Sequence, residues 1–161
     1  MGMRIFRNLA GALLAAALVA LAGCAVTPGM TRDEVLSARG KPTAERDRAG
    51  VHRLQYTTQP MGQSVLMVDM DASGKVQQAR EVMNLNAFSQ IDLSGSTTRD
   101  DILWAFGPPA QIDHVMSWTG DIWAYRWREV QDMWFWVYFD PQGVVRRTQQ
   151  GMDLTLFRLV R

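Results

Sequence analysis

The sequence predicts an α+β fold of two tandem repeats. Each repeat is expected to hold two helices and a three-stranded antiparallel meander, and together the repeats are expected to form an antiparallel sheet with helices on one face. Three observations support this prediction: one helix signal occurs twice, similar strand patterns follow it in the same order, and the spacing between matching residues is nearly constant. We therefore interpret the chain as an internal duplication.

The repeated helix signal occupies residues 31–42 and residues 98–109. In both copies a threonine precedes an acidic residue by three positions, which is the spacing of a capping box. An apolar face follows, and then a glycine and proline that favour the end of a helix. We expect a helix of about two turns in each copy. Residues 85–91 predict a further short helix before the second of them.

Strand patterns follow each helix in the same order. Apolar and aromatic residues predict a first strand, then a second strand, a tight turn that begins with aspartate and ends with glycine, and a third strand. The first two strands and the turn are expected at residues 51–58, Val65–Met70 and 71–74 in one repeat, and at 122–128, 134–139 and 140–143 in the other.

The N-terminal residues resemble the signal of a bacterial lipoprotein precursor. Arg4 and Arg7 precede an apolar segment at 9–22, and Leu21, Ala22, Gly23 and Cys24 match a lipobox that ends in the only cysteine. In such precursors the cysteine is lipidated and the chain is cut before it. The apolar segment is short for a membrane-spanning helix, which needs about 20 residues. The resemblance thus implies a membrane attachment through lipid on Cys24.

The position after Cys24 is Ala25 rather than aspartate. By resemblance to the sorting rule of Gram-negative lipoproteins, this implies localisation at the periplasmic face of the outer membrane. Two or more acyl chains suffice for stable anchoring. The predicted organisation is a signal peptide at 1–23, a lipidated tether at 24–30, repeats at 31–83 and 84–152, and a C-terminal tail at 153–161.

Charge and cysteine content narrow the function classes. The chain has 17 basic and 16 acidic residues, and loss of the signal peptide removes Arg4 and Arg7. A nearly neutral chain does not predict nucleic-acid binding, which needs a concentrated basic face. With its one cysteine used for lipid, the mature chain has no disulfide to stabilise it.

The repeated motif resembles a known family. The run from Thr31 through Gly40 and Pro42, its copy from Thr98, the aromatic strand and the later Asp-x-x-Gly turn resemble the SmpA/OmlA (BamE-like) outer-membrane lipoproteins. Two such units in tandem resemble the fold of the β-lactamase inhibitor protein. The resemblance implies a non-catalytic accessory protein that acts by contact with a periplasmic or outer-membrane protein, in β-barrel assembly or envelope integrity, without a small-molecule substrate. The alternative is a periplasmic inhibitor or binding module for an enzyme or cell-wall component.

A partner surface is predicted on the second strand of the second repeat. Trp134, Trp136 and Tyr138 alternate with apolar residues, so they share one face of the sheet. Their counterparts in the first repeat, Val65, Met67 and Asp69, are expected to point outward because Asp69 is charged. Exposed aromatic residues favour a binding site. The alternative is that sheet curvature buries this stripe as core.

Enzymatic and metal sites find little support. His52 and His114 do not occupy matching repeat positions, and no serine lies in a nucleophile elbow. Residues 69–74 imitate the start of a calcium loop, but Arg80 stands where the loop needs glutamate. We predict no catalytic residue, no metal and no cofactor. An enzyme with an unrecognised site is the third hypothesis.

Overall fold

The computed structural model describes residues 25–153. The predicted signal peptide, Cys24 and residues 154–161 lie outside the described residues, so the lipidation of Cys24 stays a prediction. Within the described part, no helix is both long and apolar enough to cross a bilayer.

Two four-stranded antiparallel sheets make up most of the fold, and each is a simple meander. The first sheet contains β1 (Ala44–Arg48), β2 (Val51–Thr57), β3 (Val65–Met70) and β4 (Val76–Glu81). The second contains β5 (Gln111–Val115), β6 (Trp118–Arg128), β7 (Asp132–Phe139) and β8 (Val145–Met152). The helices are α2 (Arg32–Arg39), α3 (Leu85–Phe88) and α4 (Arg99–Phe106).

The predicted fold class is therefore wrong. The repeats are not helix–helix–three-strand units, because each sheet has a fourth strand and the first unit has α2 as its only described helix. The extra strands, β1 and β5, lie at sheet edges and pair with the next strand through a hairpin. In the first hairpin, Ala49 and Gly50 both have positive φ, as a tight two-residue turn requires. Backbone pairing rather than an apolar pattern stabilises β1, since its sequence is mostly charged.

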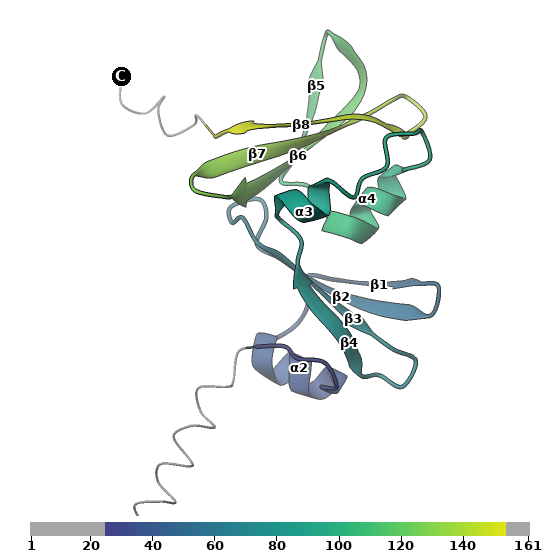
Figure 1. Ribbon diagram of the computed structural model, residues 1–161, viewed down its shortest axis with the longest axis vertical. Helices are drawn as coiled ribbons and strands as arrows, with labels where there is room; N and C mark the ends of the chain where they lie inside the picture. Colours follow the sequence, from purple (N-terminus) through teal and green to yellow (C-terminus); the bar gives the residue numbers. More distant parts are fainter. Residues whose placement is uncertain (1–24, 154–161) are drawn as a thin grey trace, which may run out of the picture.

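The sheets are also separate layers rather than one sheet with helices on one face. As Figure 1 shows, α2 covers one side of the first sheet, whereas α3 and α4 lie between the two sheets. Helices thus cover both faces of the first sheet but one face of the second. Among the described residues, no helix lies on the outer side of the second sheet, where the β5–β6 hairpin rises at its edge (Figure 1).

Two apolar clusters hold these layers together. The smaller one joins Val35 of α2 to the first sheet. The larger one joins α3 and α4 to both sheets, and it includes Met67 of the first sheet and Phe135 of the second. Phe88 of α3 stacks on Phe135, with ring centroids 3.9 Å apart and an interplanar angle of 5°. The second unit is therefore packed on the first through its helices.

The predicted capping boxes are confirmed. Thr31 with Glu34 and Thr98 with Asp101 make both reciprocal bonds. Each helix ends at a glycine with φ near 75°, Gly40 or Gly107. Each unit also has an equivalent tyrosine hydrogen bond to the glycine at the end of its helix. The hydroxyl of Tyr56 donates to the carbonyl of Gly40, and that of Tyr125 donates to the carbonyl of Gly107.

Candidate interaction surface

The alternation of buried and half-buried residues along β7 identifies the side chains on the outer face of the second sheet. Phe135, Val137 and Phe139 are at most 3% exposed and belong to the core between the sheets. Trp134, Trp136 and Tyr138 point to the opposite face and are half-buried. The two sequence-based alternatives, an open stripe or buried core, are thus resolved toward a partly exposed stripe.

Strand register arranges this face in cross-strand rows, because directly opposed residues lie on the same side of a sheet. Tyr138 lies opposite Ile122 and Arg147, and Trp136 lies opposite Ala124 and Gln149. The edge strand β5 extends both rows. From β5 to β8 the first row is Asp113, Ile122, Tyr138 and Arg147, and the second is Gln111, Ala124, Trp136 and Gln149.

Arginine side chains pack against the aromatic rings of this face. The guanidinium of Arg147 lies 4.1 Å from the ring centroid of Tyr138. That of Arg126 lies 5.6 Å from the ring of Trp134 and donates to Asp153 at 3.0 Å. The rings of Trp134 and Trp136 are 6.5 Å apart and tilted by only 22°. Trp, Tyr and Arg are the residue types that contribute most to protein–protein binding energy.

A pocket of about 420 Å³ adjoins the aromatic face at the junction of the two units. Its lining includes Trp134 and Arg126 of the second unit, and Pro60 and Met61 of the loop between β2 and β3. Gln59 fixes this loop, since its side chain donates to the carbonyl of Arg126 at 2.6 Å and accepts from the Arg126 N–H. Only the packing of the two units brings this loop next to Arg126.

The counterpart face of the first sheet differs, and one expectation fails there. Val65, Met67 and Asp69 do not point to solvent: they are at most 3% exposed, because α4 and its neighbours cover them. Asp69 is instead neutralised by Arg53, which makes a two-pronged contact with its carboxylate. The charge of Asp69 marks a buried ion pair and not an exposed strand position.

The Arg53 side chain also holds α4 in place. Its Nη1 donates to the carbonyl of Trp104 at 2.6 Å, and its guanidinium lies 3.9 Å from the Trp104 ring centroid. Gln55 donates to the carbonyl of Leu103 at 3.0 Å. The first sheet therefore binds the carbonyl end of a helix, where unpaired C=O groups carry partial negative charge.

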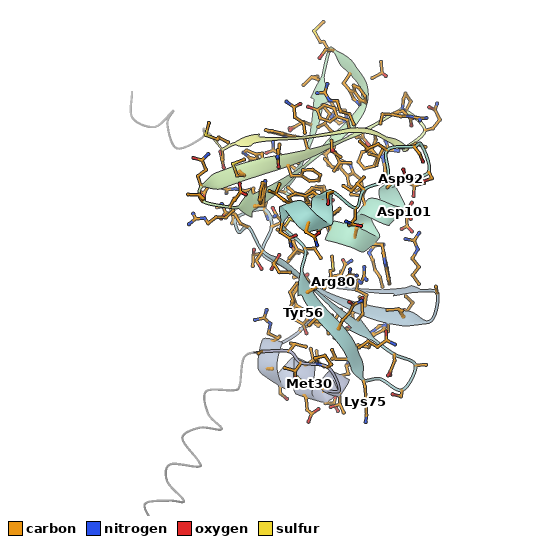
Figure 2. The ribbon with its side chains drawn as sticks, viewed as in Figure 1. Met30, Tyr56, Lys75, Arg80, Asp92 and Asp101 are labelled. Atoms are coloured by element: carbon orange, nitrogen blue, oxygen red, sulfur yellow. The ribbon has the colours of Figure 1, made fainter. Side chains whose placement is uncertain are left out.

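Electrostatics at this junction favour ionised carboxylates. Burial by itself raises the pKa of Asp69, but hydrogen bonds and charge from Arg53, with help from Arg80 and Gln78, outweigh it and hold the pKa below its usual value. Figure 2 shows Arg80 on the α4 side of the first sheet and Tyr56 on the α2 side.

The two histidines lie on different sheets, and neither lies at the centre of the aromatic face. His52 of β2 contacts Asp47 at 2.8 Å and Glu45 at 3.0 Å, and His114 of β5 contacts Asp121 at 3.0 Å. Within residues 25–153, no group of three His, Cys, Asp or Glu side chains is arranged to hold a metal ion.

Comparison with known proteins does not assign a family. No family model matches the chain, and no curated protein matches it. A solved structure, a DUF4309 family protein (YjgB) from Bacillus subtilis subsp. subtilis str. 168, is 14% identical over 76% of this chain and 78% of that one, with a TM-score of 0.33. At this TM-score the similarity supports no statement about fold or function. The resemblance to SmpA/OmlA lipoproteins stays a prediction.

Proposed function

We propose that this protein is a non-catalytic lipoprotein, anchored to the outer membrane through Cys24, that acts by protein–protein contact through the outer face of the second sheet. The observation that carries the proposal is the row of half-buried aromatic side chains, Trp134, Trp136 and Tyr138. In the first sheet the same face is covered by α4, whereas in the second no described helix lies over it.

The physical chemistry of this face favours contact over catalysis. Rings that are already half-buried and held by arginine lose little side-chain entropy when a partner covers them, so most of their apolar burial contributes to binding. The lipobox at residues 21–24 and the absence of aspartate at position 25 support the proposed location. A role in β-barrel assembly or envelope integrity is what the family resemblance adds to this proposal.

Crosslinking mass spectrometry of the native lipoprotein, isolated from outer-membrane fractions through a C-terminal tag, tests the proposal. We expect the wild type to enrich outer-membrane or periplasmic proteins. The variants Trp134→Ala and Trp136→Ala should retain their circular dichroism spectrum but lose this enrichment, and Cys24→Ala should reduce it because the chain leaves the membrane. Met116→Ala, at the fully exposed tip of the β5–β6 hairpin, is the matched control.

Two results would contradict the proposal. If Trp136→Ala folds and enriches the same proteins as the wild type, the aromatic face is not the contact surface. If the enriched molecule is a periplasmic enzyme or a cell-wall component and Cys24→Ala makes no difference, the protein is the binding module that the sequence left as an alternative.

A further inference from the structure

We propose that the outer face of the second sheet binds the same face of a second copy of this chain, in a two-fold symmetric dimer. The inference rests on the proposed function in one respect, since it takes the same face as the working surface and names its partner. The charges and amides at the two ends of each cross-strand row indicate a second copy of this chain as the partner.

The two ends of the first row carry opposite charges. Asp113 lies on the edge strand β5 and Arg147 on the opposite edge strand β8, in register through Ile122 and Tyr138. Within residues 25–153 neither side chain has an ion-pair partner: Asp113 accepts from Gln111 at 3.0 Å, and Arg147 donates to Gln149 at 2.8 Å. Each charge is therefore available to an opposite charge from outside the chain.

A two-fold axis parallel to the strands, between two stacked sheets, uses this arrangement. The strand order β5-β6-β7-β8 means that the axis places β5 of one copy over β8 of the other, and β6 over β7. Aligned stacking of this kind is one of the two common ways in which sheets pack. Positions along the strands are preserved, so Asp113 of each copy faces Arg147 of the other.

The second row is complementary under the same operation. It has an amide at each end, Gln111 and Gln149, and amides pair with each other because each carries donors and an acceptor. In its middle, Ala124 is 0% exposed, so the half-buried ring of Trp136 supplies the apolar contact at the centre of this row.

In an alternative arrangement, α2 of another copy would pack on this face in the way that α4 packs on the first sheet. The charges disfavour this arrangement. The first sheet attracts the acidic start of α4 through Arg46 and Arg48, which pair with Asp100 and Asp101. The corresponding edge strand of the second sheet carries Asp113 instead. Asp113 would repel the acidic first turn of α2.

The size of the face sets the expected strength. Eight residues of β7 and the width of four strands set an upper limit of about 500 Å² per copy, or about 1,000 Å² in total, on the footprint of the contact. Specific interfaces of this area are at the weak end of the known range. We therefore expect a reversible dimer whose population depends on concentration and falls at high salt, which screens the rim charges.

Charge reversal tests the geometry directly. The chain starting at residue 24 with Cys24→Ala, which contains every described element, is analysed by sedimentation equilibrium. We expect a monomer–dimer equilibrium that Asp113→Arg and Arg147→Asp each weaken by about tenfold or more, since each change creates like-charge contacts at both ends of the interface. The control is Asp47→Arg, an exposed aspartate on the edge strand of the first sheet.

Mixing the two variants supplies the decisive result. A dimer of one Asp113→Arg chain and one Arg147→Asp chain pairs opposite charges at both ends, so the mixture should recover the wild-type dissociation constant, as should the double variant. A wild type that stays monomeric at all measurable concentrations overturns the inference, and so does a dimer that the reversals leave unchanged or that the mixture does not restore.

These outcomes are separable from those of the proposed function. If the wild type is monomeric but captures other proteins in a Trp136-dependent manner, the proposed function stands and the homotypic contact is wrong. If the dimer forms as described but no other protein is captured, the homotypic contact stands and the proposed capture of other proteins is wrong.

Discussion

At the scale of single residues, Arg53 and Asp69 show how a charged strand position becomes part of a core. Both are at most 3% exposed, and Arg53 serves three acceptors or rings at once: the Asp69 carboxylate, the Trp104 carbonyl and the Trp104 ring. Burying two charges costs free energy that their pairing has to offset. The pair is therefore sensitive to the loss of one member.

Removal of Arg53 should be far more harmful than removal of a surface arginine. We expect Arg53→Met to lower the free energy of unfolding by about 3–5 kcal/mol, because Asp69 is left buried without its main partner. The double variant Arg53→Met/Asp69→Leu should recover much of this loss. Urea denaturation provides the measurement, with Arg146→Met as control, since the Arg146–Asp140 pair is partly exposed and about 0–1 kcal/mol is expected. A loss below 1 kcal/mol for Arg53→Met would show that the network contributes little.

At the scale of secondary structure, the two capped helices have the same local chemistry in different surroundings. Both begin with a complete capping box and end at a glycine. However, α2 lies against one sheet whereas α4 lies between two. The sequence predicted the caps correctly because they depend on residues three positions apart.

Cap removal should therefore have similar costs in both helices. We expect Thr31→Ala and Thr98→Ala each to lower the free energy of unfolding by about 1 kcal/mol, the usual value of an N-cap side chain. Ser37→Ala, in the exposed middle of α2, is the control and should cause no loss, because alanine has the higher helix propensity. Chemical denaturation of the three variants and the wild type measures these differences in the free energy of unfolding. Equal stability of Thr98→Ala and the wild type would show that the sheets alone hold α4.

The missed strands also belong to this scale. β1 consists of alanine and charged residues, and β5 has exposed ends, so neither shows the apolar alternation by which strands are recognised. An edge strand pairs with only one neighbour, and the backbone hydrogen bonds of that pairing do not depend on side-chain polarity. Hairpin geometry decided that these segments pair.

At the scale of the whole molecule, the layers make the junction between the units a point of pH sensitivity. Asp69 lies there with Arg53, and Asp101 of α4 bonds Arg48 of the first sheet. For Asp101, too, burial raises the pKa, but bonds from Thr98 and Arg48 outweigh it and lower the pKa in the folded state. Figure 2 shows Asp101 on α4 in this middle layer.

Stability should fall in acid. Since both carboxyls have a lower pKa in the folded chain than in the unfolded one, the unfolded chain binds protons more readily, and the stabilisation present above about pH 4 is lost as pH falls through the folded values. We expect the urea midpoint to drop between about pH 4 and pH 2, and to drop less in Asp69→Asn, whose starting stability is already reduced. Asp33→Asn, on exposed α2, should retain the full wild-type dependence. A wild-type midpoint that does not change in acid would contradict this account.

The sequence by itself determined the local features: two capped helices with glycine ends, the β2, β3, β6 and β7 strands, and the fact that Trp134, Trp136 and Tyr138 share one face of β7. These follow from neighbouring residues, whose spacing dictates caps and faces. Only the tertiary structure decided that there are two sheets, that α4 covers Met67 and Asp69, and that Asp113 and Arg147 end one row. These depend on which distant segments stack, and many different stackings bury the same apolar residues, so periodicity alone does not select among them.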